Sequence, residues 1–433
     1  MSSQSSNRLP DSPITRLPDS CDVAVVGAGA AGLATAIFAR RVLPSHSIVV
    51  LEGAKKPGAK ILISGGGRCN VTNSEVTDAD FWGGRRTIVR QILRALPAAE
   101  TIAWFREMGV PLHEEAGGKL FPNTNRARDV VDALVAGVAA AGVPIVANCR
   151  VLEAVREAGG FRVTTSRGTL DARVLVLATG GRSLPKSGSD GAGYAVAEHL
   201  GHGIVATTPG LVPFTLGGSN PYHQDLAGVS HDVELTIWAQ DAVAIRLRGA
   251  LLWTHFGISG PVALDASRHW ARARLLGHDT RVTVNFCPGQ SFDDLDRRLA
   301  RLPHDRPKGS IHGTIATLVP ASVATLLLRE VGVEPSGELS HLSRDHRRRI
   351  VHALTEWTLE VSDTRGYNYA EVTAGGVALT DIDPSTMRSR ICPGLYLVGE
   401  ILDVDGRVGG FNFQWAWSSA FVAARGLSTD RRL

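Results

Sequence analysis

A glycine motif near the start of the chain has the residue types and spacing to bind a dinucleotide. Gly27-Ala-Gly-Ala-Ala-Gly32 follows the G-x-G-x-x-G pattern, and Glu52 lies 25 positions after Gly27. In this pattern Gly27 permits a tight turn, Gly29 lets the backbone approach a pyrophosphate, and Gly32 lets a helix pack closely on a sheet. The phosphates would lie at the positive helix end, and Glu52 would bind a free ribose 2′-hydroxyl, which favours FAD or NAD over NADP. An ordinary packed turn is the alternative interpretation.

A second glycine-rich segment could present backbone N–H groups to an anion or to a ring edge. It reads Lys60-Ile-Leu-Ile-Ser-Gly-Gly-Gly-Arg-Cys-Asn70. Lys60 and Arg68 bracket the glycines with cations suited to phosphates or to a reduced, anionic flavin. A mobile surface loop is the alternative.

Two residues are candidates for chemistry on a substrate. Cys69 could act as a general acid, and we expect the neighbouring Arg68 to lower the pKa of its thiol; a small buried packing residue is the alternative. His255 is the second candidate, with a structural histidine as the alternative.

The elements that position these residues follow from local patterns. Asp22 to Val26 predicts a strand, the glycine turn follows it, and the alanine-rich Leu33 to Arg41 predicts a helix before a strand at Ser47 to Leu51. Further helices are predicted at Arg85 to Met108, Ala127 to Ala141, Phe292 to Leu302, Ala321 to Val331, His346 to Leu359 and about Asn412 to Arg425. Further strands are predicted at Pro144 to Ala147, Phe161 to Thr165, Val174 to Ala178, Leu211 to Leu216, Val233 to Ile237, Val282 to Phe286 and Leu395 to Val398.

These patterns divide the chain into four parts. Strands and helices alternate in the first part of the chain, and the same pattern returns near the C-terminus. We therefore expect a discontinuous nucleotide-binding domain at 21–205 and 366–433. A β-rich domain is expected at 206–290 and a helical subdomain at 291–365. Residues 1–20 lack the apolar region of a secretory signal, so they are not expected to be one. We expect them to form a flexible arm.

Composition excludes several classes of protein. The net charge is +4 over 433 residues, too small for a dedicated nucleic-acid surface, so stable DNA binding is not expected. The five cysteines are scattered without a C-x-x-C pair, which indicates neither disulfides nor a metal site and favours the cytoplasm. The uncharged run Val23 to Ala39 approaches the length of a membrane span, but its glycines favour the dinucleotide turn, so no membrane association is expected.

Five separated motifs together resemble a known family. They are Gly27–Gly32, Lys60–Asn70, Trp253-Thr-His-Phe-Gly-Ile-Ser-Gly-Pro261, Thr373-Ala-Gly-Gly-Val377, and Gly399-Glu400 through Asp403 to Gly409-Gly-Phe-Asn-Phe-Gln414. In this order they resemble the BaiN/YhiN-like family of bacterial NAD(P)/FAD-dependent oxidoreductases, from about Asp22 to Gly426. The resemblance implies an α/β fold with a discontinuous, glutathione-reductase-type, FAD-binding Rossmann-like domain, an inserted β-rich domain and a small helical subdomain.

The family pattern implies a set of FAD contacts along the chain. It assigns to FAD the residues Gly27, Gly29, Gly32, Glu52, Lys60, Ser64, Gly65, Gly67, Arg68, Val151, Thr179, Gly180, Gly399, Glu400, Asp403, Gly410, Phe411, Asn412 and Phe413. Within this set Val151 would contact adenine, and the helix that begins near Gly410 would point its dipole at the flavin pyrimidine edge. Phe411 and Phe413 depart modestly from the residues usual at those positions.

The resemblance implies an FAD-dependent oxidoreductase that takes hydride from NADH or NADPH and reduces an activated C=C or C=N bond. Its substrate would be a small molecule or an RNA base, including uracil in ribosomal RNA reduced to dihydrouridine. An FAD-dependent amine oxidase that passes electrons to O₂ is one alternative, and a structural-flavin protein that binds RNA or protein is another. No second complete G-x-G-x-x-G follows a strand, so nicotinamide would bind transiently or not at all.

Overall fold

The computed structural model describes residues 16–433, apart from 219–221 and 306–307. The chain divides into two compact units, Met1–Thr207 with Val372–Leu433 and Thr208–Glu371. The predicted arm at 1–20 lies outside the described residues up to residue 15, and Ser20 already begins the first strand.

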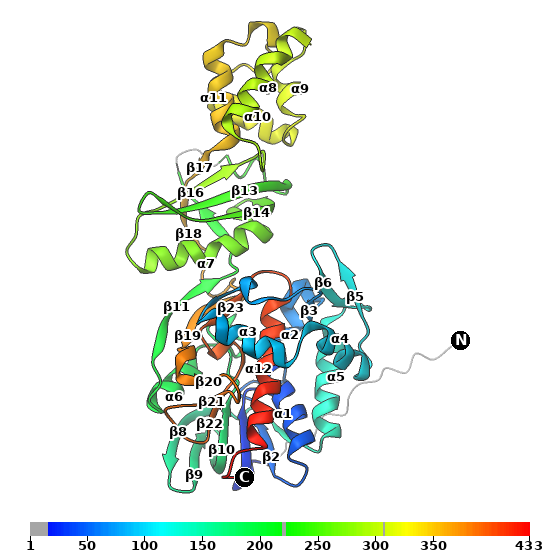
Figure 1. The fold of residues 1–433 in the computed structure, drawn as a ribbon, viewed down its shortest axis with the longest axis vertical. Helices are drawn as coiled ribbons and strands as arrows, with labels where there is room; N and C mark the ends of the chain where they lie inside the picture. Colours follow the sequence, from blue (N-terminus) through cyan, green and yellow to red (C-terminus); the bar gives the residue numbers. More distant parts are fainter. Residues whose placement is uncertain (1–15, 219–221, 306–307) are drawn as a thin grey trace, which may run out of the picture. The chain divides into compact units, whose positions relative to one another are not determined.

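A mostly parallel sheet lies at the centre of the first unit, in the order β20-β21-β22-β10-β1-β2-β7 (Figure 1). The parallel strands are β1 (Ser20–Val26), β2 (Ile48–Leu51), β7 (Ile145–Val146), β10 (Gly168–Leu177) and β22 (Leu395–Leu397). The antiparallel strands are β20 (Ile382–Asp383), β21 (Arg388–Ser389) and the hairpin β8 (Val151–Glu157) and β9 (Gly160–Thr165), which extends from β10. The second half of β1 is a run of small and β-branched apolar residues that is buried throughout, as expected of a parallel strand covered on both faces.

Among the described residues, seven α-helices belong to the first unit. They are α1 (Ala30–Val42), α2 (Ala59–Ile63), α3 (Arg86–Ala95), α4 (Ala98–Glu107), α5 (Ala127–Ala140), α6 (Ala192–His199) and α12 (Phe411–Leu427). In α1 nine consecutive residues are buried, because the helix packs against neighbours on all sides. Figure 1 shows α12, in red, beside α1, in blue, and the rings of Phe38 and Phe421 meet edge to face at 5.3 Å. Segments from opposite ends of the chain therefore share one core.

The predicted single helix from Arg85 to Met108 is wrong. The structure has α3 and α4 with a break at Leu96 and Pro97. Proline disfavours helical backbone at the residue before it, so the helix stops before Pro97. The helical spacing of apolar residues continues on both sides of this break, which is why the sequence predicts one helix.

Three small sheets complete the first unit. They consist of β3 (Thr72–Asn73), β6 (Lys119–Pro122) and β5 (Leu112–Glu115); of β4 (Phe81–Gly83) and β23 (Val404–Gly406); and of β11 (Ile204–Gly210) and β19 (Val372–Val377). The last pair lies where the chain leaves the first unit and returns to it.

The second unit contains an antiparallel sheet and a group of helices. The sheet has the order β17 (Trp357–Leu359), β16 (Thr280–Asn285), β13 (Ser230–Ala239), β14 (Ala242–Thr254), β15 (Gly257–Ser259), β12 (Phe214–Leu216) and β18 (Val361–Thr364). The helices are α7 (Pro261–Leu275), α8 (Phe292–Asp305), α9 (Ile311–Ile315), α10 (Ala321–Glu330) and α11 (Arg344–Thr355). One cluster of buried residues runs from the sheet into the helices, so both share a core.

The predicted helix from His346 to Leu359 ends earlier than expected. Residues Trp357 to Leu359 form β17, whose Leu359 pairs with Val282 of β16. A helical pattern of apolar residues is overridden here by pairing with a strand about 75 residues away in the chain. Across the described residues, no helix is both long and apolar enough to span a membrane.

Candidate dinucleotide site

Four parallel strands of the first unit end at the same edge of the sheet. Val26 of β1 is in register with Leu51 of β2 and Leu177 of β10, and Leu177 is in register with Leu397 of β22. The residues that follow these strands therefore gather at one edge, where open α/β sheets bind their ligands. They include Gly27, Glu52, Thr179 and Gly180, and Gly399 and Glu400.

The turn between β1 and α1 is built for close approach. A Cβ atom at Gly32 would lie 1.8 Å from the carbonyl oxygen of Gly27, so only glycine fits. At Gly29 an added Cβ would meet no atom within 4 Å, which leaves open space in front of α1. This helix has no capping side chain and no acidic residue in its first turn. Its N-terminal N–H groups and dipole thus suit an anion such as a pyrophosphate.

Glu52 braces this turn. Its Oε2 accepts a hydrogen bond from the Ala28 N–H at 2.7 Å, and its Oε1 accepts one from the Ala54 N–H at 2.7 Å. Burial raises the pKa of the carboxyl, while the two N–H donors lower it. The Glu52 carbonyl also accepts a hydrogen bond from the Cys149 N–H. This bond places the segment just before Val151 of β8 beside Glu52.

Lys60 and Glu400 meet although 340 residues separate them. The Lys60 Nζ lies 2.6 Å from Glu400 Oε2 and 2.5 Å from Ser183 Oγ. The second oxygen of Glu400, Oε1, accepts hydrogen bonds from the Ser183 hydroxyl and from the Thr373 N–H, both at 2.9 Å. Lys60 is therefore paired and partly buried, and it links α2 to the segments of Ser183 and Glu400.

Sequence reasoning missed two members of this network, Ser183 and Thr373. Ser183 lies in the loop that follows the predicted strand and Gly180-Gly181, and that position was an available signal. Thr373 lies in a motif that supported the family resemblance, but no role was assigned to it. Its hydroxyl accepts hydrogen bonds from the N–H groups of Arg182 and Ser183.

The glycine loop that follows Lys60 is tightly folded. Gly65, Gly66 and Gly67 have φ values of +54°, +68° and +84°, and the Cys69 N–H donates to the Ser64 carbonyl at 3.1 Å. Arg68 ion-pairs with Glu115 at 2.6 Å, and its guanidinium lies 4.0 Å from the Phe121 ring centroid. Its charge is thus already balanced within the protein.

Cys69 has the opposite pKa shift from the one expected. Its side chain is fully buried, and burial raises the pKa of the thiol to about 12, although the Ser64 hydroxyl lowers it. The expected lowering by Arg68 is wrong, because desolvation of the thiolate dominates and the guanidinium is engaged by Glu115.

The start of α12 lies in the same unit and, like those of α1 to α6, has no capping side chain. Gly410 precedes α12 with φ +93°, and a Cβ there would lie 2.4 Å from the Thr72 carbonyl group. The helix has no capping side chain and no acid in its first turn. Asn412 holds the first turn of α12 against the end of β23, because its side-chain amide exchanges two 2.8 Å hydrogen bonds with the backbone of Gly406. Among the other predicted contacts here, Phe411 is buried and Phe413 stacks on Trp417 at 5.7 Å.

Gly399 joins α1 to α12. An added Cβ would lie 2.8 Å from the Ala31 side chain, the Gly399 carbonyl accepts from Trp415 Nε1, and its N–H donates to the Ser419 hydroxyl. Asp403 follows this segment, is nearly buried, and accepts from the Gly84 N–H through its carbonyl oxygen.

Two buried hydroxyls at the sheet edge have no hydrogen-bond partner among the described residues. They are Thr179 Oγ1 and Ser189 Oγ. A Cβ at Gly180 would lie 2.9 Å from Ser189 Oγ, and one at Gly188 would lie 3.9 Å from Glu52 Oε1, so Ser189 lies at the same edge as Glu52. The Thr179 hydroxyl lies against the start of α6, where a Cβ at Gly193 would come within 1.9 Å of it. Buried polar atoms normally have partners, and a polar ligand here would supply them. The edge therefore fits a dinucleotide.

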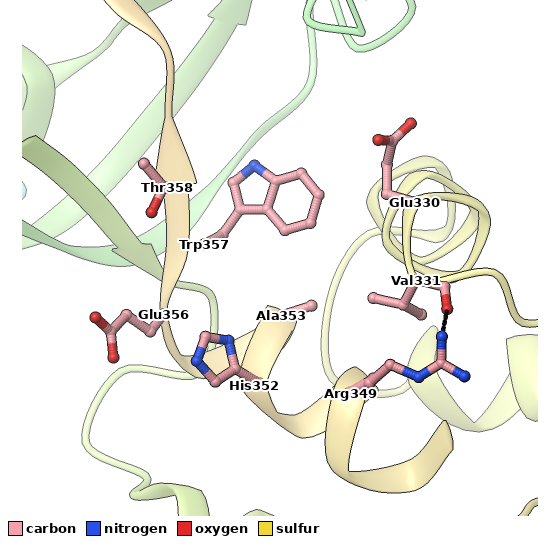
Figure 2. A pocket seen from close by; sticks show the side chains of 8 residues that line it. All are labelled: Glu330, Val331, Arg349, His352, Ala353, Glu356, Trp357 and Thr358. Carbon is pink, nitrogen blue, oxygen red and sulfur yellow. Dashed lines mark hydrogen bonds between the residues drawn. The ribbon is translucent and has the colours of Figure 1, made fainter. Parts of the chain in front are cut away.

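The remaining predicted residue, His255, lies in the second unit, exposed in the turn between β14 and β15. That unit also has a cavity of about 310 Å³ between α10, α11 and β17, shown in Figure 2. Its lining includes Arg349, which donates to the Val331 carbonyl, and His352, Glu356 and Trp357. None of the predicted catalytic or cofactor-binding residues lines this cavity.

The sheet order, the glycine turn and the helices that follow it define a Rossmann-like α/β protein. Residues 21–426 match the model of the HI0933-like protein Rossmann domain, and the chain belongs to that family. The match and the parallel sheet confirm the predicted α/β Rossmann-like fold class and the family resemblance.

Named relatives cover nearly the whole chain. The "Ribosomal RNA dihydrouridine synthase" of Escherichia coli is 34% identical over 94% of this chain and 98% of its own length. The "3-dehydro-bile acid delta(4,6)-reductase" of Clostridium scindens is 30% identical over 93% of this chain and 98% of its own length. Among solved structures, the 3-ketosteroid delta1-dehydrogenase of Sterolibacterium denitrificans has a TM-score of 0.51 at 13% identity, covering 96% of this chain and 100% of that one, a likeness in fold alone.

Proposed function

We propose that the first unit binds FAD and that the protein is a flavin-dependent reductase. The observation that carries the proposal is the convergence, at one sheet edge, of the open space at Gly29, the braced Glu52 and the partnerless hydroxyls of Thr179 and Ser189. When bound, FAD would supply two-electron chemistry.

The chain's own residues divide the work of holding this group. The N-terminus of α1 would bind the pyrophosphate, and Glu52 would hold the turn while its carboxylate receives a ribose hydroxyl. Lys60, fixed by Glu400 and Ser183, would hold a positive charge near the ligand. The N-terminus of α12 would stabilise negative charge on the ring after reduction. The remaining predicted contacts, including Val151, Asp403 and the Ser64–Arg68 loop, are proposed with them.

For the reaction, we propose that NADH or NADPH donates hydride and that an activated C=C bond is reduced. Two relatives support this choice, since the names of both refer to products or bonds of C=C reduction: dihydrouridine in ribosomal RNA and a bile acid Δ4,6 bond. We propose uracil in ribosomal RNA as the substrate, because the relative with that name is 34% identical over 94% of the chain. The five cysteines, all free and buried, support a reducing compartment such as the cytoplasm.

An anaerobic visible spectrum of the purified protein tests the proposal. We expect a flavin spectrum that bleaches when NADH or NADPH is added, and we expect ribosomal RNA from a deletion strain to lose one dihydrouridine that the wild-type gene restores. A colourless protein that does not bind added FAD contradicts the flavin site. Flavin that neither nicotinamide reduces, with hydrogen peroxide formed from an amine, would instead establish an oxidase.

A further inference from the structure

In the second unit, the side chain of Arg365 lies between two aromatic rings. Its guanidinium carbon is 4.3 Å from the ring centroid of Phe256 and 3.4 Å from that of Tyr369. Phe256 lies in the turn between β14 and β15, and Arg365 follows β18. Because β15 and β18 flank β12 on its two sides, the sheet itself brings these residues together.

Backbone hydrogen bonds hold this stack in place. The Arg365 N–H donates to the Pro213 carbonyl at 3.0 Å, and the Phe256 carbonyl accepts from the Leu216 N–H at 3.1 Å. A turn at Gly366, whose carbonyl accepts from the Tyr369 N–H, returns Tyr369 toward Arg365. The geometry is therefore present before any ligand arrives.

The donors of the Arg365 guanidinium have no acceptor among the described residues. In the part of the chain that the structure describes, no carboxylate or carbonyl accepts a hydrogen bond from the Arg365 side chain. Among the other described arginines that stack on a ring, Arg68, Arg281 and Arg407 each have a carboxylate partner within 3.1 Å, whereas Arg41, Arg156, Arg274 and Arg348 each stack on one ring without such an ion pair. Arg365 stacks on two rings and has none, so its fork of N–H donors is fixed and available to an acceptor.

We propose that Arg365 binds a backbone phosphate of single-stranded RNA and that Tyr369 stacks on a base of the same strand. This inference rests on the proposed function, whose substrate it refines. A guanidinium matches the oxygens of a phosphate, and single-stranded RNA is commonly held by aromatic rings and arginine planes. Tyr369 is 51% exposed, and the exposed His255 lies beside Phe256 with their ring centroids 5.1 Å apart, which adds a donor.

The charge of the second unit favours a specific contact over general attraction. Residues 208–371 contain 17 lysines and arginines against 18 acidic residues, so the unit has no excess of positive charge to attract RNA from a distance. The nearby Asp363 accepts from the Thr364 N–H through its side chain. Binding of RNA to this unit would therefore depend strongly on a few residues such as Arg365.

The test is binding of a fluorescent, uridine-containing single-stranded RNA oligonucleotide to the oxidised holoenzyme, by anisotropy at several salt concentrations. We expect Arg365→Ala to raise Kd at least fivefold and to reduce the slope of log Kd against log salt by about 0.7, the loss of one phosphate contact. Tyr369→Ala should raise Kd without changing the slope, and Tyr369→Phe should bind as the wild type does. Arg301→Ala, which removes an exposed arginine of α8, is the matched control and should change neither quantity.

Wild-type affinity and salt slope in a folded Arg365→Ala variant would overturn the inference. So would a wild-type protein that binds no RNA while its flavin is reduced by nicotinamide, and that result leaves the flavin reductase standing. If Arg365→Ala loses its structure by circular dichroism, Arg365→Lys decides: it keeps the charge but loses the fork, and RNA affinity equal to wild type would contradict the proposal. Because binding is measured without turnover, its outcome is independent of the reductase assay.

Discussion

At the scale of single residues, the same side chain can organise the protein and face a ligand. Glu52 was predicted from its spacing alone, and the structure shows that its carboxylate already braces the glycine turn through the N–H groups of Ala28 and Ala54. Lys60 was also predicted, but its pairing with Glu400 depends on folding that brings together residues 340 apart. No local pattern encodes such a pair, and for the same reason Ser183 and Thr373 were missed.

Because two buried thiols have raised pKa values, we expect the folded protein to lose stability at high pH. Burial raises the pKa of Cys21 and Cys69 to about 12, from an ordinary value of 9.0. Their stabilising effect is complete below pH 9 and is lost as pH rises toward 12, because only the unfolded state then ionises. Each thiol should reduce the folding equilibrium constant by about tenfold per pH unit across that window.

Chemical denaturation of wild type and Cys69→Ala at pH 8, 10 and 11 checks this. The variant should show a weaker pH dependence than the wild type, and equal slopes would contradict the shift. The same variant tests Cys69 as the proton donor, since we still propose that it keeps FAD and loses substrate reduction. Full turnover in Cys69→Ala removes that role.

At the scale of elements, the starts of α1 and α12 are the parts of the fold on which the proposed ligand contacts most depend, α1 because of the open space at Gly29 and α12 because Gly410 approaches the Thr72 backbone closely. Their starts were predicted within three residues for α1 and one for α12, because a strand, a glycine turn and an apolar helical run are local signals. The break between α3 and α4 and the strand β17 were not, because a proline turn and a distant strand partner override the helical period there. Sequence therefore predicts the strand-turn-helix at the site better than the elements that surround it.

Two glycines three positions apart should respond differently to alanine. Gly32→Ala places a Cβ 1.8 Å from a backbone oxygen and should destabilise the protein by at least about 3 kcal/mol. Gly29→Ala meets no protein atom within 4 Å and has an ordinary φ of −82°, so the protein should fold with nearly unchanged stability. It should nevertheless lose FAD affinity by more than tenfold, about 1.4 kcal/mol, because the methyl occupies the space in front of α1.

Thermal melting of the apoproteins and flavin titration of both variants separate these effects. A Gly29→Ala protein that is stable and binds FAD as tightly as the wild type would show that the open space is not the pyrophosphate site.

At the scale of the whole molecule, the two units differ in how they should respond to acid. The second unit holds three histidines, His223, His231 and His269, whose pKa values are lowered by burial, that of His269 to about 3. Because these imidazoles are buried in their neutral form, their contribution to the stability of the unit is complete above pH 6.5. It is lost as the pH falls, because the histidines of the unfolded state take up protons first. The described part of the first unit has one such histidine, His202.

As the pH falls below 6.5, the second unit should lose protection from hydrogen exchange before the first. Exchange measured by mass spectrometry and corrected for intrinsic rates checks this order, with His269→Gln as the variant that keeps more protection in acid. Parallel loss of protection in both units would contradict the prediction.

The interruption of the first unit also has a consequence during protein synthesis. β10 pairs with β22 and α1 packs on α12, yet β22 and α12 are translated only after all of Thr208–Glu371. At about 5–20 residues per second, the ribosome needs roughly 10 to 45 s to translate from Thr207 to the end of α12. Throughout that interval the apolar sides of α1 and β10 lack the partners that cover them in the folded protein, so the proposed flavin site is not complete until α12 has been translated.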